Sequence, residues 1–279
     1  MSGDDPGSDL RLAELALEVA RAAGRLIRQR RDEGVTVAAT KTSQTDIVTE
    51  TDREVEVLIR SLLADARPDD GIVGEEGDDE PGATGVRWIV DPIDGTVNFL
   101  YGIPQYAVSV AAERDGVVVA GVVLDVARDT AYVGRRETGP DGQVTVTADR
   151  DGRPISVRSP APLAQRLIGT GFSYEAGIRA IQADAVSRLL PRVRDIRRLG
   201  SCALDLCHVA EGLLDGYVEE GVNLWDFAAG VLIAEGAGAR SELAPGAGGQ
   251  ELLVCAPAHG FEDFRKVVEQ AGFLAISGE

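Results

Sequence analysis

The stretch Trp88-Ile89-Val90-Asp91-Pro92-Ile93-Asp94-Gly95-Thr96 contains an apolar run that ends in two aspartates three residues apart. The apolar part is typical of a buried strand, and we expect Pro92 to stop that strand because proline cannot donate a ladder hydrogen bond. Gly95 allows the backbone to turn tightly, so Asp91 and Asp94 can face one point. The pattern predicts a strand whose end presents two carboxylates.

A second apolar stretch, Gly71–Gly74, runs straight into Glu75 and Glu76. Hard cations such as Mg²⁺ prefer oxygen ligands, usually a few carboxylates together with water and a substrate phosphate. Carboxylates packed closely also need a cation, because like charges otherwise raise each other's pKa. The two strand ends therefore predict a cation site. Plainer interpretations stay open for single residues: Asp94 as half of an Asp-Gly turn, Asp226 as the N3 acid of a helix capped by Asn223, and Asp52 as a helix-start acid.

The composition describes an acidic, globular chain. Its 279 residues include 28 lysines and arginines against 46 aspartates and glutamates, which gives a formal net charge of −18. A hydrophobic fraction of 44% and a charged fraction of 27% exclude wholesale disorder, collagen and a membrane bundle. No apolar run approaches the roughly 18 residues that a spanning helix needs. A chain this acidic should repel nucleic acid and anionic membranes, so we expect no direct contact with either.

The N-terminal stretch and the cysteines favour a cytoplasmic protein. The start, MSGDDPGSDL, lacks the basic and apolar regions of a signal peptide. Cys202, Cys207 and Cys255 show no metal-type spacing, which is typical of free thiols in a reducing compartment. The chain has only two histidines, so a hydrolase of this composition would use metal-activated water more readily than a histidine-assisted nucleophile.

Hydrophobic periodicity predicts helices and strands that build a layered α/β architecture. In the first half we expect a helix over 9–31 capped by Asp9, a helix near Thr51 opened by a Thr51–Glu54 capping box, and strands over 71–74, 86–90, 107–112, 117–123 and 130–133. In the second half we expect strands over 167–170, 193–199, 216–219 and 252–255, and helices over 175–190, 201–214, 224–235 and 260–271. A disordered tail over 1–8 would precede halves over 9–158 and 159–279.

Three separated motifs resemble the inositol monophosphatase family of Mg²⁺-dependent phosphatases. They are Gly74-Glu75-Glu76, Asp91–Thr96 continued through Asn98-Phe99 and Gly102-Ile103-Pro104, and Trp225-Asp226-Phe227-Ala228-Ala229-Gly230. The segment Lys41–Asp52 is similar to the family's early segment, and Gly200–Asp205 resembles its substrate loop. The segment Gly134–Arg153 departs from the family pattern, with Asp-Gly turns and extra length. The resemblance implies a layered αβαβα sandwich of the sugar-phosphatase type.

The resemblance also implies a role for each matching residue. The implied metal ligands are Glu75, Asp91, the Ile93 carbonyl, Asp94 and Asp226, which would hold up to three Mg²⁺. Asp52 and Thr96, with Glu75, would position or deprotonate the attacking water. The implied substrate contacts are Asp94, Gly95, Thr96, Gly200, Ser201, Cys202, Glu219 and Asp226. Family members commonly form homodimers and are often inhibited by Li⁺.

The function that the resemblance implies is hydrolysis of inositol 1-phosphate to inositol and phosphate by metal-activated water. Relatives with the same chemistry act on fructose 1,6-bisphosphate, histidinol phosphate or 3′-phosphoadenosine 5′-phosphate, and these substrates stay open. Glu219 and the Gly200–Asp205 segment favour a phosphorylated polyol. A different class also stays open, because some bacterial members act as binding modules in RNA-polymerase-associated complexes.

Overall fold

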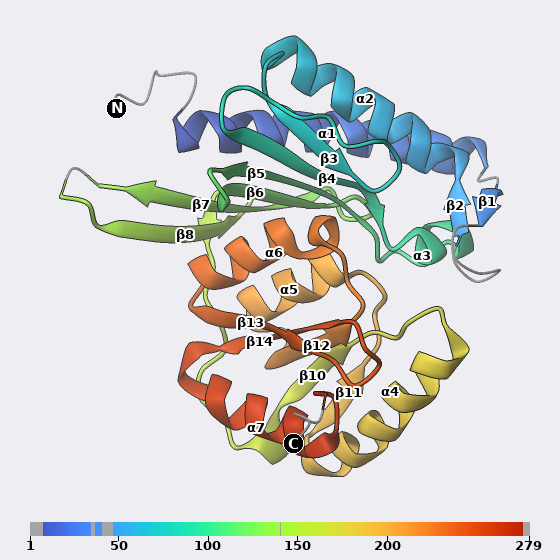
Figure 1. Ribbon diagram of the computed structural model, residues 1–279, viewed down its shortest axis with the longest axis vertical. Helices are drawn as coiled ribbons and strands as arrows, with labels where there is room; N and C mark the ends of the chain where they lie inside the picture. The colour runs from blue at the N-terminus through green and yellow to red at the C-terminus, as the bar shows by residue number, and fades with distance from the viewer. Residues whose placement is uncertain (1–7, 35–36, 41–46, 140, 276–279) are drawn as a thin grey trace.

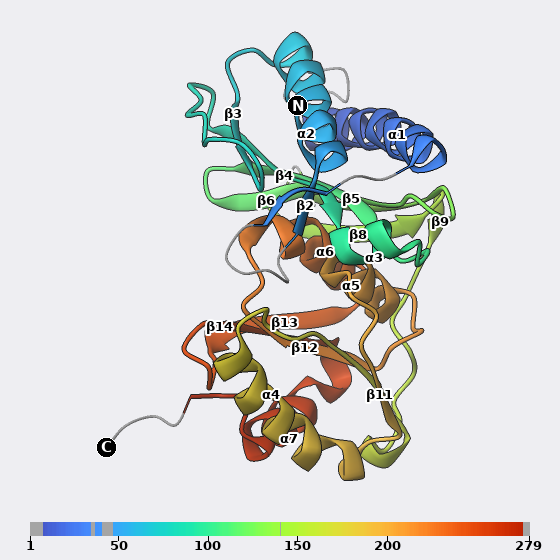
Figure 2. The ribbon, with the colours of Figure 1, turned by 90° about the vertical axis from the view of Figure 1, so that its right-hand side faces the viewer.

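A computed structural model describes residues 8–34, 37–40, 47–139 and 141–275 (Figure 1). Five layers follow one another: helices, a seven-stranded sheet, helices, a five-stranded sheet, and helices (Figures 1 and 2). The predicted αβαβα sandwich is therefore confirmed. Residues 1–7 of the predicted tail over 1–8, and the early-segment residues Lys41 and Asp46, lie outside the described residues.

The larger sheet has its strands in the order β3-β4-β5-β6-β7-β8-β9. Their bounds are Gly71–Gly74, Val86–Asp94, Ala107–Arg114, Val117–Asp125, Thr130–Thr138, Val144–Arg150 and Arg153–Pro154. β3 and β4 are parallel and the other neighbours are antiparallel. Since Gly74 pairs with Val90, the two strands leave the ladder together and bring Glu75 and Asp91 to the same edge.

The smaller sheet has its strands in the order β11-β10-β12-β14-β13. Their bounds are Asp195–Arg197, Leu167–Thr170, Gly216–Glu220, Glu251–Pro257 and Ala239–Pro245. β10 is parallel to β11 and β12, whereas β14 is antiparallel to β12 and β13. A separate pair, β1 (Val37–Thr40) and β2 (Ile47–Thr49), lies next to the start of α2.

Three helix layers cover the sheets (Figure 2). α1 (Asp9–Glu33) and α2 (Glu50–Ala66) cover the outer face of the larger sheet. α5 (Cys202–Ala210) and α6 (Leu224–Gly236) lie between the two sheets, and α4 (Ala176–Leu189) and α7 (Phe261–Ala271) cover the outer face of the smaller one. None of the described helices is long and apolar enough to span a bilayer.

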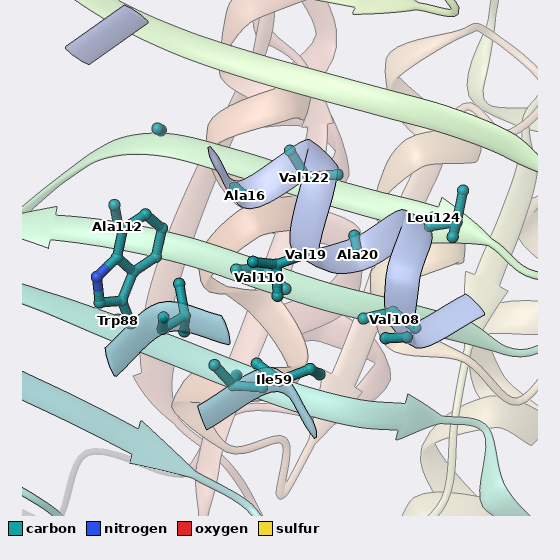
Figure 3. Packing of buried hydrophobic residues seen from close by; sticks show 14 of the residues in the cluster. Ala16, Val19, Ala20, Ile59, Trp88, Val108, Val110, Ala112, Val122 and Leu124 are labelled. Atoms are coloured by element: carbon teal, nitrogen blue, oxygen red, sulfur yellow. The ribbon is translucent and has the colours of Figure 1, made fainter. Parts of the chain in front are cut away.

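The buried side chains form three clusters: one on the outer face of the larger sheet, one around the middle helices and one on the outer face of the smaller sheet. The cluster on the outer face of the larger sheet joins the apolar faces of α1 and α2 to alternate residues of β4, β5 and β6. Val108, Val110 and Ala112 of β5 are examples (Figure 3). Strand alternation sends Ala107 and Ala111 to the opposite face, where α5 and α6 pack. Both sheets pack on that middle layer, so the division of the chain at 158 and 159 into halves stays a prediction.

Two glycines allow α6 to lie against the larger sheet. A Cβ at Gly121 would stand 2.9 Å from the Ala229 Cα, and one at Gly134 would stand 2.9 Å from the Ile233 nitrogen. Side chains at either position would push the helix outward. The close approach matters because the first turn of α6 carries Asp226.

The starts of the first two helices differ from the sequence prediction. Ser8, and not Asp9, caps α1, and its side chain accepts a hydrogen bond from the Arg11 nitrogen. Ser8 therefore belongs to the helix start and not to a tail. α2 begins at Glu50, one residue before the predicted start, and its capping box joins Thr49 to Asp52 and not Thr51 to Glu54. Glutamate or glutamine is usual at the third helical position of a capping box, which favoured Glu54 in the prediction. The shorter side chain of Asp52 also reaches back to the cap.

Several strand predictions also need correction. β4 continues past Pro92 to Asp94, because the ladder with β5 breaks between Asp91 and Asp94 and requires no hydrogen from the proline. β13 is missing from the prediction, since its sequence ARSELAP contains a single large apolar residue and three polar residues in a row. The segment 134–153 extends β7 and adds β8 and β9, and its Asp151-Gly152 turn has φ angles of 49° and 74°, as a tight hairpin requires.

Candidate active site

A cavity of about 420 Å³ opens where strand ends of both sheets meet the first turns of α5 and α6. The larger sheet and α3 (Thr96–Tyr101) contribute Glu75, Asp91, Ile93, Asp94, Gly95 and Thr96 to its lining. The smaller sheet and the middle helices contribute Gly200, Cys202, Glu219 and Asp226, among others. Every predicted site residue lines this cavity except Asp52 and Ser201, which contact residues that do.

The end of β4 is folded so that its two aspartates leave the strand differently. Asp91 accepts a hydrogen bond from the Ile93 nitrogen at 2.9 Å, which closes a turn over Pro92. Gly95 has a φ of 96°, a left-handed conformation that side-chain-bearing residues rarely adopt. A Cβ there would also stand 2.9 Å from the Gln105 carbonyl oxygen. The predicted need for glycine at this turn is confirmed.

Asp52 reaches the cavity through Thr96. One oxygen of the Asp52 carboxylate accepts from the Thr49 nitrogen at 2.9 Å and from the Thr49 hydroxyl. The other oxygen lies 3.1 Å from the Thr96 hydroxyl, which also lies 3.0 Å from the Ile93 carbonyl oxygen. Burial raises the pKa of Asp52 to about 6, although its hydrogen bonds from Thr49 lower it. Asp52 is therefore both a helix-start acid and a hydrogen-bond partner of the cavity wall.

Asp94 joins the two parts of the site. Its carboxylate accepts from the Ser201 hydroxyl at 2.6 Å, from the Ala203 nitrogen at 2.7 Å and from the Cys202 nitrogen at 3.3 Å. The donors are the cap and first turn of α5, where unpaired N–H groups favour an anion. Ser201 thus affects the cavity by fixing the position of the Asp94 side chain. The hydrogen bonds of Asp94 connect the end of β4 to the start of α5.

The acids of the cavity destabilise one another's charged forms. Burial raises the pKa of Asp91 and Asp226 well above the ordinary value, and the carboxylates of Glu75 and Asp94 raise both further. Burial also raises the pKa of Asp94 to about 7, although its bonds from Ser201 and Ala203 lower it. Such a concentration of buried negative charge is the environment that a divalent cation would stabilise.

The donor set fits a hard cation. Four carboxylates and the Ile93 carbonyl oxygen line the cavity and could serve as oxygen ligands. Within the part of the chain that the structure describes, no three acidic, histidine or cysteine side chains already form a metal cluster. The fit therefore depends on the chemistry of the donors and not on a preformed coordination geometry.

Comparison with known proteins now decides the family. The inositol monophosphatase family model matches residues 9–264, which is most of the chain and includes all the carboxylates described above. The chain belongs to the inositol monophosphatase family. It is 45% identical over 268 residues to an inositol-1-monophosphatase SuhB of Mycobacterium tuberculosis, with 91% of each chain covered.

Two further relatives are similar to this chain over most of its length. A crystal structure of the extragenic suppressor protein suhB from Bartonella henselae matches with a TM-score of 0.83 and 30% identity, covering 92% of this chain and 98% of that one. A Nus factor SuhB of Pasteurella multocida is 35% identical over 232 residues, covering 81% of this chain and 83% of that protein. The family is thus shown to include proteins named for two different roles.

In the present protein, the Glu219 carboxylate is closely surrounded by its neighbours. Tyr217 donates a hydrogen bond from its buried hydroxyl to Glu219. A Cβ at Gly171 would stand 2.0 Å from the Glu219 carboxylate, so only glycine leaves room for it. Burial raises the pKa of Glu219 to about 7, whereas the Tyr217 hydrogen bond and the nearby Arg198 charge lower it.

Sequence reasoning missed much of the rim. The cavity is lined between β10 and α4 by Phe172, Ser173, Tyr174 and Glu175, and just before β14 by Gln250. The buried Gln182 holds this rim by accepting from the Ser173 nitrogen at 2.8 Å. Loops that follow the carboxyl ends of parallel strands commonly bind ligands, so the position of 171–175 directly after β10 was the signal available.

Proposed function

We propose that this protein is a Mg²⁺-dependent phosphatase that hydrolyses inositol 1-phosphate to inositol and phosphate. One observation carries the proposal: a single cavity collects Glu75, Asp91, Asp94 and Asp226 from opposite halves of the sequence. A phosphate monoester is itself an anion, so a cavity of this charge would exclude it unless cations reverse the local sign. Family membership and the 45% identical relative, which is named for this activity, support the same assignment.

Bound cations would neutralise the phosphate charge and lower the pKa of a water, which is how metals accelerate phosphate-ester hydrolysis. The chain's own residues would then direct the proton of that water. Thr96 can donate its hydroxyl hydrogen to Asp52 and accept one from the water, so the proton is directed away from the phosphate. Glu75 also lines the cavity and would orient the same water molecule together with Thr96.

The charges around the cavity favour a polyol monophosphate over a bisphosphate. Away from the expected cation ligands, the lining includes Glu175, Glu219 and Glu220. Arg198 is the one basic side chain among the described residues that line it. Carboxylates accept hydrogen bonds from hydroxyl groups but repel a second phosphate. A ring of hydroxyls therefore fits this wall better than fructose 1,6-bisphosphate or 3′-phosphoadenosine 5′-phosphate.

A substrate panel tests the proposal. Phosphate release from inositol 1-phosphate, fructose 1,6-bisphosphate, histidinol phosphate and 3′-phosphoadenosine 5′-phosphate is measured with Mg²⁺ and after chelation. We expect kcat/KM to be at least about 10-fold higher for inositol 1-phosphate and to vanish on chelation. Undiminished turnover after thorough chelation would contradict the metal mechanism, and a preference for a bisphosphate would contradict the substrate.

Three further parts of the proposal concern the state of the protein. We propose a homodimer, which sedimentation would detect, and inhibition by Li⁺, which an activity titration would measure. We also propose a cytoplasmic location. The three cysteines are free and buried, which agrees with a reducing compartment.

A second candidate function is a role in an RNA-polymerase-associated complex, which the name of the Pasteurella relative brings into view. The retained set of four carboxylates favours catalysis over a purely structural use of the fold. The net charge of −18 favours a protein partner over direct contact with RNA. Co-purification of polymerase subunits with the Asp226→Asn variant, at wild-type yield, would support this second function independently of catalysis.

A further inference from the structure

We infer that Glu56 and Arg60 of α2 are positioning residues that hold the segment carrying Glu75 in the orientation needed to bind a cation. The inference rests on the proposed function, since it concerns the cation that the carboxylates would hold. Glu56 and Arg60 do not line the cavity, and they act through the backbone that follows β3.

The contacts of Glu56 are specific to that backbone. Its side chain is almost fully buried, with the residue 2% exposed. One carboxylate oxygen accepts from the Glu76 nitrogen at 2.8 Å, and the other accepts from the Gly77 nitrogen at 2.8 Å. The two residues directly after Glu75 are therefore bound to one carboxylate. Their N–H groups are fixed in direction, so the backbone that carries the Glu75 side chain is fixed as well.

The chain is shaped around the Glu56 carboxylate. A Cβ at Gly74 would stand 2.6 Å from a Glu56 oxygen, and a Cβ at Gly77 would stand 2.8 Å from the same oxygen. Real Cβ atoms do not approach oxygen that closely. Glycines thus lie on both sides of Glu75-Glu76, and the backbone turns closely around a buried anion of α2.

Arg60 balances that buried charge. Its Nε donates to the Glu56 carboxylate at 2.8 Å, one turn further along α2. Another of its nitrogens donates to the Glu80 side chain at 3.0 Å, in the middle of the segment that joins β3 to β4. A buried carboxylate is costly unless a counter-charge and hydrogen-bond donors satisfy its oxygens. Arg60 therefore holds the Glu56 carboxylate in the position from which it accepts two backbone hydrogen bonds.

The placement of these residues on α2 links both acidic strand ends. Asp52, Glu56 and Arg60 are spaced four residues apart, so they share one face of the helix. Asp52 bonds Thr96, which follows β4, and Glu56 bonds the segment that follows β3. One rigid helix therefore sets the distance between the two segments from which Glu75 and Asp91 would bind the same cation.

Direct cation binding tests the inference. Metal-free protein is titrated with Mn²⁺, used as the probe for the divalent site, and free Mn²⁺ is measured by electron paramagnetic resonance. Glu56→Gln keeps the shape but offers one acceptor oxygen, so its NH₂ must face a donor. We expect Mn²⁺ affinity to fall about 10–100-fold, the usual cost of losing a group that orients a metal ligand. At saturating Mg²⁺ we expect kcat and the KM for inositol 1-phosphate to return to within about twofold of wild type, since a bound cation would then hold Glu75 in its orientation.

Asp70 supplies a matched control at the other end of β3. It is also buried, binds Arg67 at 2.7 Å and binds the Trp88 nitrogen at 3.0 Å. Asp70→Asn disturbs a comparable network without touching the segment at Glu75, so Mn²⁺ affinity should stay at the wild-type value. Glu54→Gln, on the exposed side of α2, controls for charge on that helix.

The outcomes separate the inference from the proposed function. Wild-type affinity for Mn²⁺ in Glu56→Gln, or an equal loss in Asp70→Asn, would overturn the positioning role and leave the proposed function standing. A wild-type protein that binds no Mn²⁺ would overturn the proposed function and this inference with it. Should Glu56→Gln not fold, Arg60→Gln keeps both acceptor oxygens of Glu56 and removes the counter-charge together with the hydrogen bond to Glu80. It should then lower Mn²⁺ affinity in the same direction, and unchanged affinity there would reject the inference.

Discussion

The first turns of α2 and α6 are built alike and face different neighbours. Each helix carries an aspartate at its third position, and each aspartate accepts a hydrogen bond from the backbone nitrogen of its own cap. Asp52 accepts from Thr49 at 2.9 Å, and Asp226 accepts from Asn223 at 2.6 Å. The second carboxylate oxygen of Asp52 lies next to the Thr96 hydroxyl, whereas Asp226 has the charges of Asp94 and Glu75 as its neighbours in the cavity.

The comparison shows that the same capping box can present an aspartate to two different kinds of neighbour. A capping carboxylate is held at a fixed angle by its own helix, so its second oxygen is aimed without further support. Asp52 is aimed at a threonine hydroxyl, as the proposed proton acceptor would be. Asp226 is aimed at other carboxylates, as the proposed cation ligand would be. The helix-start interpretation of both residues is confirmed, and it is compatible with the proposed catalytic roles.

The largest expected effect distinguishes the two aspartates by their dependence on metal. Asp226→Asn should lower kcat/KM for inositol 1-phosphate by at least about 10³-fold, because a cation supplies several kcal/mol and about 1.4 kcal/mol is a factor of ten. It should also weaken Mn²⁺ binding. Asp52→Asn removes an equivalent cap but should weaken Mn²⁺ binding far less than Asp226→Asn, because Asp52 reaches the site only through Thr96, so each variant controls for the folding cost of the other. Equal metal affinities in the two variants would break the comparison.

A double-mutant cycle examines the Asp52 side of the comparison. Thr96→Val keeps the β-branched shape and removes the hydroxyl, so kcat should fall by about 10²-fold or more with little change in KM. Asp52→Asn should give a similar loss. Because the two residues act as one unit, the double variant should be little worse than either single one in steady-state kinetics. Multiplicative losses would return Asp52 to a role in capping alone.

A smaller effect concerns the polyol side of the cavity near Asp226. Tyr217→Phe removes the hydroxyl that bonds Glu219 and should raise the KM for inositol 1-phosphate roughly 10-fold, the value of a hydrogen bond to a charged group. That bond lowers the pKa of Glu219, which burial holds at about 7. Without it the pKa rises, so the defect should shrink as pH is raised from 7 to 9. For p-nitrophenyl phosphate, which lacks hydroxyls, KM should not change, and an equal rise for both substrates would point to a general packing defect.

The smallest expected effect is on the stability of the metal-free protein. Burial raises the folded-state pKa of Asp94 to about 7 and that of Asp52 to about 6, above their ordinary values. A raised carboxyl pKa stabilises the fold at low pH, and this contribution is lost as pH rises from about 4 through the folded pKa. The melting temperature of chelated protein should therefore fall by a few degrees between pH 5 and pH 8, and Mg²⁺ should restore it. Asp226→Asn should flatten this slope more than Asp52→Asn, and the reverse order would contradict the assigned neighbours.

The sequence predicted most of the fold and the strand-end acids of the cavity wall, for identifiable reasons. Strongly apolar runs such as Gly71–Gly74 and Leu167–Thr170 coincide with their strands, because burial on both faces leaves a clear composition signal. The acids at strand ends were found because their motifs are contiguous. β13 was not found, because a partly exposed edge strand has no such signal.

The residues that sequence reasoning missed act through tertiary contacts. Glu56 is one of several acids on an amphipathic helix, and nothing in its local sequence shows that it binds the backbone near Glu75. Gly171 likewise has no turn to form, and its importance comes from the Glu219 carboxylate that occupies the space of its Cβ. Such roles depend on which elements pack together, which periodicity does not specify.

All the strands of the larger sheet precede those of the smaller one, so the polypeptide passes between the sheets in a single linker between β9 and β10. A fragment ending in that linker would carry Glu75, Asp91 and Asp94, with the inner face of its sheet uncovered. The remaining fragment would carry α5, α6 and Asp226, with no partner for the helix faces that normally meet the larger sheet. Cut at this linker, the chain offers the two parts of a split reporter, in which colour from a chromogenic phosphate would record the reunion of the fragments.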